Sequence, residues 1–233
     1  MNTDALGVAP AGDDEAYIRL QTAELGSQLR GTNVYFVGMM GTGKTSVARN
    51  LADRMGRYTF MDTDAIIEQL MQAPVAKVFE EQGEEEFRDI EARVLNELHS
   101  YVKLVVATGG GIVKEKRNWG KLQTGLVVWL DMAIDDIVKR LSSNEEEVSK
   151  RSLLQGGDVA AKLQAIYDER KAMYEQASTS SSADVRVYVS PDDSVDAVVL
   201  SSVSELQKFI DSNPPKWQQW KDSAKASGIN WVN

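Results

Sequence analysis

The chain has no cysteine and a single histidine, His99, among its 233 residues. Without cysteine the protein can form no disulfide framework, thiolate nucleophile or cysteine metal site, and its redox compartment stays open. A lone histidine cannot build a histidine-based metal centre, so His99 is expected to be structural or exposed. Chemistry that depends on sulfur or on clustered imidazoles is therefore excluded.

A long apolar run is also missing, since no stretch approaches the roughly 20 residues that a membrane-spanning helix needs. No transmembrane helix is therefore expected. The first 30 residues have neither the basic start nor the apolar stretch of a secretory signal. They carry Asp4, Asp13, Asp14 and Glu15, whereas transit peptides are poor in acidic residues. We therefore expect no targeting peptide within this chain.

Basic residues are fewer than acidic ones, 26 against 35, and the formal net charge is −9. Nucleic acids and membrane surfaces are polyanions that such a surface does not attract, so neither is expected as a partner. A negatively charged small ligand would have to be bound by a few arginines gathered at one place.

What the sequence does contain is the pattern of one α/β domain. Short apolar runs bounded by glycine, aspartate or turns predict five strands, at residues 34–37, 58–62, 104–108, 126–130 and 185–189. Helical periodicity separates them, including a helix at residues 45–55, and a short helix near residues 17–29 precedes them. This alternation predicts a parallel sheet covered on both faces, which binds its ligands at the carboxyl ends of the strands.

Residues 38–45 match the phosphate-binding pattern G-x-x-x-x-G-K-[ST], between a predicted strand and a predicted helix. The glycines allow backbone N–H groups to surround phosphate oxygens, and the helix presents its positive end to the same anion. Lys44 is expected to reach the β- and γ-phosphates of ATP, and the Thr45 hydroxyl to hold Mg²⁺. The predicted ATP-binding residues of this segment are Gly38, Gly41, Thr42, Gly43, Lys44, Thr45 and Ser46.

Two carboxylates, Asp62 and Asp64, close the second predicted strand. At this spacing both can point the same way and lie beside the phosphate loop. One can hold Mg²⁺ or its water, while the other accepts a proton or hydrogen bond from a substrate hydroxyl. The structural alternative is that Thr63 or Asp64 caps the next helix, and capping can coexist with a catalytic role.

Four arginines are candidates for binding anions. Arg88 lies at the start of a predicted amphipathic helix, and taken alone this position predicts a surface ion pair. Arg170 lies on the apolar stripe of a later helix, where a guanidinium must reach water or find an anion; a structural ion pair and a ligand clamp both stay open. Arg151 lies on a polar segment typical of a flap that closes over a phosphoryl group. Arg140 is either a helix C-terminal cation or a platform for the adenine ring.

Three consecutive glycines, Gly109, Gly110 and Gly111, follow the third predicted strand. Such a run costs chain entropy. It therefore indicates a backbone that must approach another group closely, with a plain tight turn as the alternative.

Together these motifs resemble those of the shikimate kinases, and of the plant and algal form in particular. The resemblance covers residues from about 30 to 210 and rests on residues 37–45, 62–64, 87–91 (Phe-Arg-Asp-Ile-Glu), 108–111, 129–131 and 151–154, with Arg170 and Tyr174. The phosphate loop is common to many kinases. The combination of the other motifs in this order is much more specific.

The resemblance implies a P-loop NTPase fold similar to the nucleoside monophosphate kinases: a three-layer α/β sandwich with a five-stranded parallel sheet and a mobile lid at about residues 142–158. The kinase domain is expected at residues 31–212, between an N-terminal extension (residues 1–30) and a C-terminal tail (residues 213–233). Family members usually act as monomers. The plant-type likeness implies a plastid location, with the cytoplasm as the alternative.

The activity that the resemblance implies is ATP-dependent phosphorylation of the 3-hydroxyl of shikimate, on the route to chorismate and the aromatic amino acids, with Mg²⁺ as cofactor. The family's catalytic residues correspond to Lys44, Asp64 and Arg151 of this sequence, and its metal-binding residues correspond to Thr45 and Asp62. Arg140 matches the adenine-side arginine, and residues 190–193 match the place of an adenine-contacting loop. The positions that bind shikimate match Asp64, Arg88, Gly109, Gly110, Gly111 and Arg170, with the two arginines on its carboxylate.

One position departs from the family pattern, because Ser152 stands where the lid usually has proline, which loosens a backbone constraint. A related small-molecule kinase, such as a gluconate kinase, is a second hypothesis that the arginine pair and the triple glycine disfavour. A binding protein without catalysis is a third. It should show damage in the phosphate loop or the aspartate pair, and this sequence shows none.

Overall fold

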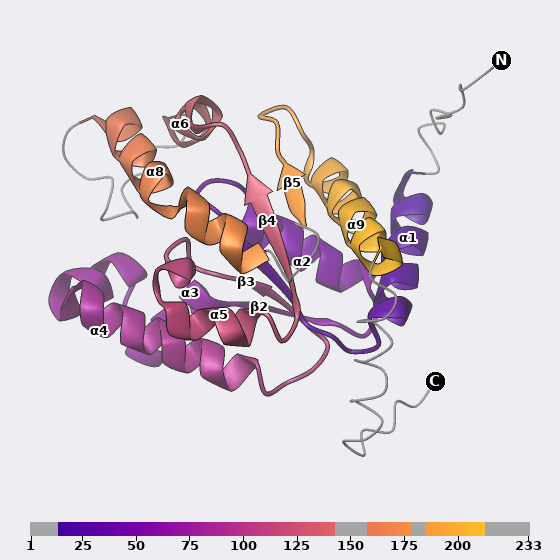
Figure 1. The fold of residues 1–233 in the computed structure, drawn as a ribbon, viewed down its shortest axis with the longest axis horizontal. Helices are drawn as coiled ribbons and strands as arrows, with labels where there is room; N and C mark the ends of the chain where they lie inside the picture. Colours follow the sequence, from indigo (N-terminus) through magenta and orange to yellow (C-terminus); the bar gives the residue numbers. More distant parts are fainter. Residues whose placement is uncertain (1–13, 143–157, 179–184, 213–233) are drawn as a thin grey trace.

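The computed structural model describes residues 14–142, 158–178 and 185–212. Within them, five strands form one sheet in the order β2-β3-β1-β4-β5, with every neighbouring pair parallel (Figure 1). The strands are β1 (Val34–Val37), β2 (Thr59–Asp62), β3 (Leu104–Ala107), β4 (Leu126–Asp131) and β5 (Arg186–Tyr188). All five predicted strands are confirmed to within one residue at either end.

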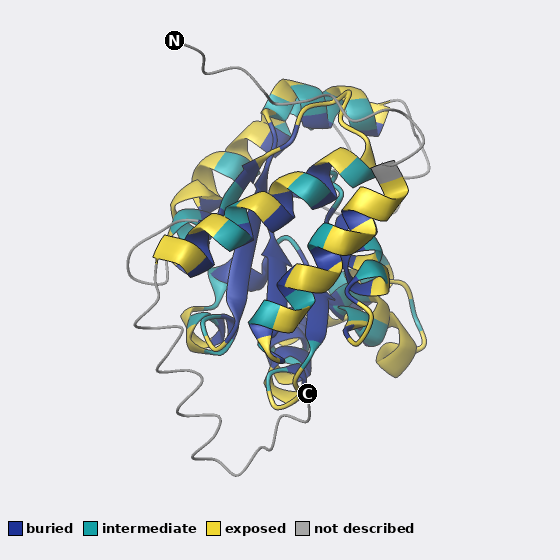
Figure 2. Cartoon of the chain, turned by 90° about the vertical axis from the view of Figure 1, so that its right-hand side faces the viewer, coloured by how far each residue is buried: buried dark blue, intermediate teal, exposed yellow. Residues whose placement is uncertain are grey.

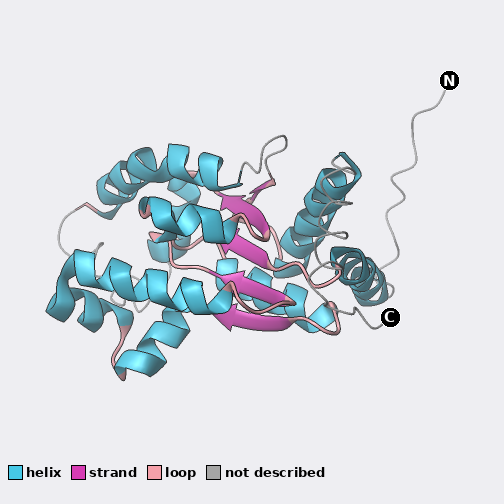
Figure 3. Ribbon diagram, turned by 60° about the horizontal axis from the view of Figure 1, so that its bottom comes forward, coloured by secondary structure: helices cyan, strands magenta, loops and turns pink. Residues whose placement is uncertain are grey.

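Helices cover both faces of the sheet. They are α1 (Asp14–Leu29), α2 (Lys44–Arg54), α3 (Thr63–Met71), α4 (Val75–Leu98), α5 (Lys116–Leu122), α6 (Ile134–Ser142), α8 (Val159–Ser178) and α9 (Val195–Ser212), with a short 3-10 helix η1 (Ile112–Lys114). Helices α1, α2 and α9 lie on one side of the sheet, and α4, α5 and α8 on the other (Figure 3). The predicted three-layer α/β sandwich is therefore confirmed.

The burial of the inner strands explains why their sequences are apolar almost without interruption. Every residue of β1, β3 and β4 is buried, because helices cover both faces (Figure 2). The edge strand β2 begins at the exposed Thr59 and is otherwise half-buried. Burial of each large apolar side chain, such as Leu51 on α2 or Leu95 on α4, stabilises the fold by about 1.5–3 kcal/mol.

Helix α1 belongs to this core, although it lies in the segment predicted as an N-terminal extension. Ile18, Leu25 and Leu29 are buried, and α1 packs against α2 and α9. The predicted helix at residues 17–29 is confirmed and begins three residues earlier, at Asp14. None of the helices in the described ranges is long and apolar enough to cross a membrane.

Helix α4 is bent at Gly83, whose φ of 80° and ψ of 169° are not helical. The bend divides the helix into two parts that line one cavity, with Phe79 before it and Phe87 and Arg88 after it. The two phenylalanine rings meet across the bend, with their centroids 5.4 Å apart. Glycine provides this conformation without the steric cost that other residues would pay.

The register of the sheet brings the carboxyl ends of its strands to one edge. Asp62 at the end of β2 pairs with Ala107 at the end of β3, and Val37 at the end of β1 pairs with Trp129 of β4. The segments that follow these strands therefore lie side by side. The phosphate loop, the aspartate pair and the triple glycine all belong to them.

Candidate active site

The phosphate loop connects β1 to α2, as predicted. Gly38 has a φ of 138°, and a Cβ at this position would overlap the backbone oxygen of Leu130, so only glycine fits between the loop and β4. Helix α2 begins directly after Gly43 and presents its first-turn N–H groups to the loop. The result is an anion site of backbone donors at the positive end of a helix.

The lysine of this loop lies inside the structure, with 9% of its surface exposed. Lys44 Nζ donates hydrogen bonds to the carbonyl oxygens of Gly38, at 2.9 Å, and Met39, at 2.8 Å. The Thr42 hydroxyl donates to the same Met39 oxygen, at 2.9 Å. These contacts hold the ammonium against the loop that the motif predicts as its phosphate cradle.

A cleft of about 710 Å³ opens beside the loop and is lined by residues 41–47 and by segments that follow the other strands. Ser46, Arg140 and Asp193 all line it. Arg140 Nη1 donates to the Gly41 carbonyl at 3.3 Å, which brings this side chain from α6 onto the phosphate loop. Asp193 belongs to the segment predicted to contact adenine. The volume is suited to a nucleotide.

The aspartate pair also lines this cleft. Asp62 Oδ2 accepts a hydrogen bond of 2.8 Å from the Thr45 hydroxyl, so the two predicted metal-binding oxygens are in contact. Asp62 Oδ1 accepts from the backbone N–H groups of Asp64, at 3.0 Å, and Ala65, at 3.3 Å. Asp62 therefore caps α3, in place of Thr63 or Asp64, the capping residues of the structural alternative. An extended residue before the helix has the geometry for this bond.

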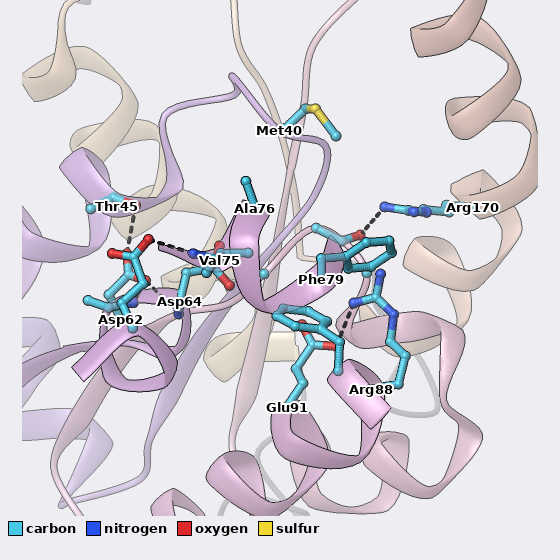
Figure 4. A pocket seen from close by; sticks show the side chains of 16 residues that line it. Met40, Thr45, Asp62, Asp64, Val75, Ala76, Phe79, Arg88, Glu91 and Arg170 are labelled. Atoms are coloured by element: carbon cyan, nitrogen blue, oxygen red, sulfur yellow. Dashed lines mark hydrogen bonds and ion pairs between the residues drawn. The ribbon is translucent and has the colours of Figure 1, made fainter. Parts of the chain in front are cut away.

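Asp64 has the electrostatics of a proton acceptor. Burial, reinforced by the nearby Asp62 carboxylate, raises the pKa of Asp64 to about 6, and the Lys44 ammonium opposes this shift. A carboxylate with a pKa close to neutrality is a more effective base than an ordinary exposed aspartate. Its side chain faces the cavity that α4 and α8 enclose (Figure 4).

Two buried arginines enter this second cavity from opposite helices (Figure 4). Arg88 on α4 is 5% exposed, and Arg170 on α8 is 3% exposed. The expectation of a surface ion pair for Arg88 was wrong, because the helix turns this side chain inward, where Nη1 donates to Glu91 Oε2 at 2.8 Å. Arg170 Nη1 donates to the Gly110 carbonyl at 3.0 Å. Buried guanidiniums of this kind require anionic or carbonyl partners.

The triple glycine passes between these charged side chains. A Cβ on Gly109 would lie 2.5 Å from Glu91 Oε1 and 2.8 Å from Asp64 Oδ1. A Cβ on Gly111 would overlap the Arg88 guanidinium. The predicted reason for the glycines, close approach of another group, is therefore confirmed at Gly109 and Gly111. At Gly110 the nearest atoms would be an ordinary 3.5 Å away.

Sequence reasoning missed three residues that complete the site. Glu91 is fully buried, burial raises its pKa to about 7, and its Oε1 has no hydrogen-bond partner among the described residues. The Thr63 hydroxyl accepts a 2.9 Å hydrogen bond from the Gly109 N–H, and the Tyr174 hydroxyl donates a 2.5 Å bond to the Gly110 carbonyl. All three fall within motifs of the family resemblance, and Glu91 also shows a local signal, its helical spacing of three residues from Arg88.

The second cavity has a volume of about 370 Å³, and apolar side chains such as Phe79 and Phe87 line part of it. It meets the phosphate-loop cleft at shared residues, namely Met40, Thr45, Asp62, Asp64 and Gly110. A phosphate donor in the larger cleft and a small anionic acceptor in the smaller cavity would therefore meet beside Asp64. The predicted lid residue Arg151 lies outside the described residues, as does Ser152.

Both the sequence and the fold match one enzyme family. The profile of the family "Shikimate kinase" matches residues 40–199. The chain is 48% identical over 155 residues to a shikimate kinase of Gloeobacter violaceus, a match that covers 66% of this chain and 85% of that protein. A shikimate kinase of Nostoc is 38% identical over 192 residues, which cover 81% of this chain and 100% of that protein.

Solved structures agree with this result. The structure of a shikimate kinase from Acinetobacter baumannii in complex with shikimate has a TM-score of 0.68 and 31% identity, and covers 81% of this chain and 98% of that one. A gluconokinase from Sinorhizobium meliloti has a TM-score of 0.50 at 16% identity, over 79% of this chain and 95% of that one, which is a likeness of fold alone. The chain belongs to the shikimate kinase family.

Proposed function

We propose that this protein transfers the γ-phosphoryl group of ATP to the 3-hydroxyl of shikimate. The observation that carries the proposal is the junction of two cavities, one with a phosphate loop and one with two buried arginines, at Asp64. The shikimate bound in the Acinetobacter structure agrees with an acceptor of this class.

On the donor side, the loop N–H groups and Lys44 bind the β- and γ-phosphates. Thr45 and Asp62 supply neutral and anionic oxygens at a 2.8 Å separation, which is the donor chemistry that Mg²⁺ prefers. The described residues contain no group of three or more histidines or carboxylates placed to hold a metal. Mg²⁺ would therefore take its remaining ligands from phosphates and water, and it supplies charge neutralisation during transfer. Arg140 contacts the adenine side.

On the acceptor side, the guanidiniums of Arg88 and Arg170 bind the carboxylate of shikimate, and Gly109, Gly110 and Gly111 let the ring approach the backbone. Asp64 orients the 3-hydroxyl and accepts its proton. The hydroxyl oxygen forms a bond to the γ-phosphorus as the bond to the β–γ bridging oxygen breaks. The products are shikimate 3-phosphate and ADP.

The lid is the remaining part of the proposed machinery. Arg151, within the lid predicted at residues 142–158, closes over the transferred group in this proposal. Ser152 in place of the usual proline affects the closure of the lid and leaves phosphate binding intact.

The other proposals concern the whole chain. We propose that it acts as a monomer, and that residues 31–212 form the kinase domain between the extension at residues 1–30 and the tail at residues 213–233. The plant and algal likeness, and with it a plastid location, stays a prediction beside a cytoplasmic one, since the relatives described above are cyanobacterial. Imaging of a fluorescent fusion in the source cell would decide between them.

A coupled assay of ADP release tests the function directly. With Mg²⁺ and ATP, the protein is expected to release ADP with shikimate, and to release far less with gluconate or without an acceptor. Preference for gluconate would point to a related sugar-acid kinase. Absence of acceptor-dependent release would favour a binding protein without catalysis.

A further inference from the structure

The two arginines of the acid cavity are connected by a chain of charges outside it. On α4, Arg88 Nε lies 3.6 Å from Glu84 Oε1. On α8, Arg170 Nε lies 3.8 Å from Glu169 Oε2. Lys114 lies between the two glutamates, with Nζ 2.7 Å from Glu84 Oε1 and 3.2 Å from Glu169 Oε1. This lysine, the last residue of η1, thereby links α4 to α8.

The glutamates bind the lysine more closely than they bind the arginines. The contacts of 3.6 and 3.8 Å to the arginines are longer than a hydrogen bond. Among the described residues, neither Arg88 Nε nor Arg170 Nε has a hydrogen-bond partner. The pKa of Glu84 is lowered, and its hydrogen bond with Lys114 is the largest cause. The lysine thus dominates the surroundings of Glu84.

We propose that Lys114 is a positioning residue for acid binding. Its ion pairs hold the two glutamates away from the guanidiniums, so that the Nε atoms of Arg88 and Arg170, which have no hydrogen-bond partner among the described residues, stay available to the carboxylate of the substrate. Lys114 does not line the acid cavity, so it acts through the other residues of the chain. The inference rests on the proposed function, in which these two arginines bind that carboxylate.

Two physical effects follow from removal of the lysine. Each glutamate is released to form a charge-assisted hydrogen bond with its neighbouring arginine, at roughly 2.8 Å, which engages the guanidinium that the substrate needs. Removal of the lysine also takes one positive charge from the surroundings of the two arginines, which already lie beside Glu84, Glu91 and Glu169. Both effects weaken binding of an acid and leave the phosphate loop unchanged.

Removal of the lysine should not unfold the protein. The Lys114 side chain is 24% exposed and both glutamate side chains are 46% exposed. Ion pairs in such positions contribute about 0–1 kcal/mol to stability. A change in the KM of shikimate can therefore be measured on a folded variant.

The first test is the variant Lys114→Met in the ADP-release assay. The KM of shikimate is expected to rise about five- to tenfold, the lower range for coupling between neighbouring sites. The KM of ATP and the kcat should stay within about twofold of the wild-type values. Lys114→Arg should retain most of the shikimate affinity. The matched control is Lys116→Met, which removes the same charge from an exposed residue two positions further along.

The decisive variant combines Lys114→Met with Glu84→Gln and Glu169→Gln. Since neutral amides are much weaker acceptors for a guanidinium than carboxylates are, the KM of shikimate should return to within about twofold of the wild-type value. A KM that stays raised, or a Lys114→Met variant with unchanged KM, overturns the inference. If the wild-type protein shows no shikimate-dependent ADP release, the proposed function fails instead.

Discussion

The nucleotide half and the acid half of the active site are built in different ways. The nucleotide half comes mainly from one continuous segment between β1 and α2, and its donors are backbone N–H groups and Lys44. The acid half joins side chains of α3, α4 and α8 to the loop after β3. Its contacts span long separations, such as 46 residues between Thr63 and Gly109. A continuous site can be identified from a motif, whereas an assembled site depends on the whole fold.

The acid half gathers several buried charges in one cavity, whereas the buried charge of the phosphate loop is Lys44. In the acid half, Arg88, Glu91 and Arg170 are each no more than 5% exposed. Buried charges are stable only with correctly placed partners, and the loss of one partner is costly. We therefore expect single changes in the acid half to affect substrate affinity strongly, and changes at the junction of the halves to affect turnover.

The largest effect is expected at the junction, in Asp64→Asn. Loss of the proton acceptor should lower kcat about 10²–10⁴-fold, because this is the usual contribution of a general base. The nucleotide half should be unaffected, so the affinity for an ATP analogue, measured by calorimetry, should be retained. A variant with nearly full kcat would remove Asp64 from the proposed role.

A pair of glycine variants compares the rigidity of the two halves. Gly38→Ala places a methyl group against the backbone of Leu130 at a positive φ, and should cost about 2–3 kcal/mol of stability. Gly111→Ala meets the end of the Arg88 side chain, which can move. It should keep most of its stability but raise the KM of shikimate. The control is Gly120→Ala on α5, where nothing lies within 4 Å. Thermal unfolding with equal losses for the first two variants would contradict the comparison.

The raised pKa of Asp64 predicts that the difference in stability between the wild type and Asp64→Asn depends on pH. Its value in the folded state, about 6, exceeds the ordinary value of 3.8, so the folded state binds the proton more tightly. The stability that Asp64 contributes therefore falls as the pH rises from about 4 to 6. Asp64→Asn does not titrate and should become more stable than the wild type, by about 3 kcal/mol above pH 6.

Denaturant unfolding of both proteins at pH 4, 5, 6 and 7.5 measures this difference, and the titration of all other groups cancels in the comparison. A difference that does not change with pH would mean that burial and Asp62 do not raise the pKa of Asp64. The test concerns the junction alone and requires neither substrate.

A smaller effect is expected for Tyr174→Phe. The hydroxyl donates to the Gly110 carbonyl, which Arg170 also contacts, and the ring stacks on Trp129 at a centroid distance of 5.9 Å. Loss of the hydroxyl should cost about 1 kcal/mol of stability. It should also raise the KM of shikimate severalfold, since the Gly110 carbonyl, which Arg170 contacts, is then held less firmly. Tyr167→Phe, on the same helix, removes only a 3.3 Å bond to Asp131 and serves as the control.

The same division explains how much of the site could be predicted from the sequence. The strands and the phosphate loop were predicted because apolar runs and a continuous motif are local signals. Arg88 taken alone was expected at the surface, and only the family resemblance assigned it to substrate binding, since its position on a helix face depends on the bend at Gly83 and on packing against α5. Thr63 and Tyr174 belong to motifs of the family resemblance but were given no role in the site, because their partners lie far away in the chain.

The division of the site into a nucleotide half and an acid half is tested most directly by the KM values of both substrates in Arg170→Ala and Arg140→Ala. We expect opposite patterns. Arg170→Ala should raise the KM of shikimate at least thirtyfold, which corresponds to a loss of about 2 kcal/mol or more of binding free energy. The KM of ATP should stay nearly unchanged. Arg140→Ala should raise the KM of ATP and leave that of shikimate nearly unchanged. Equal effects of Arg170→Ala on both substrates would contradict the division of the site into a nucleotide half and an acid half.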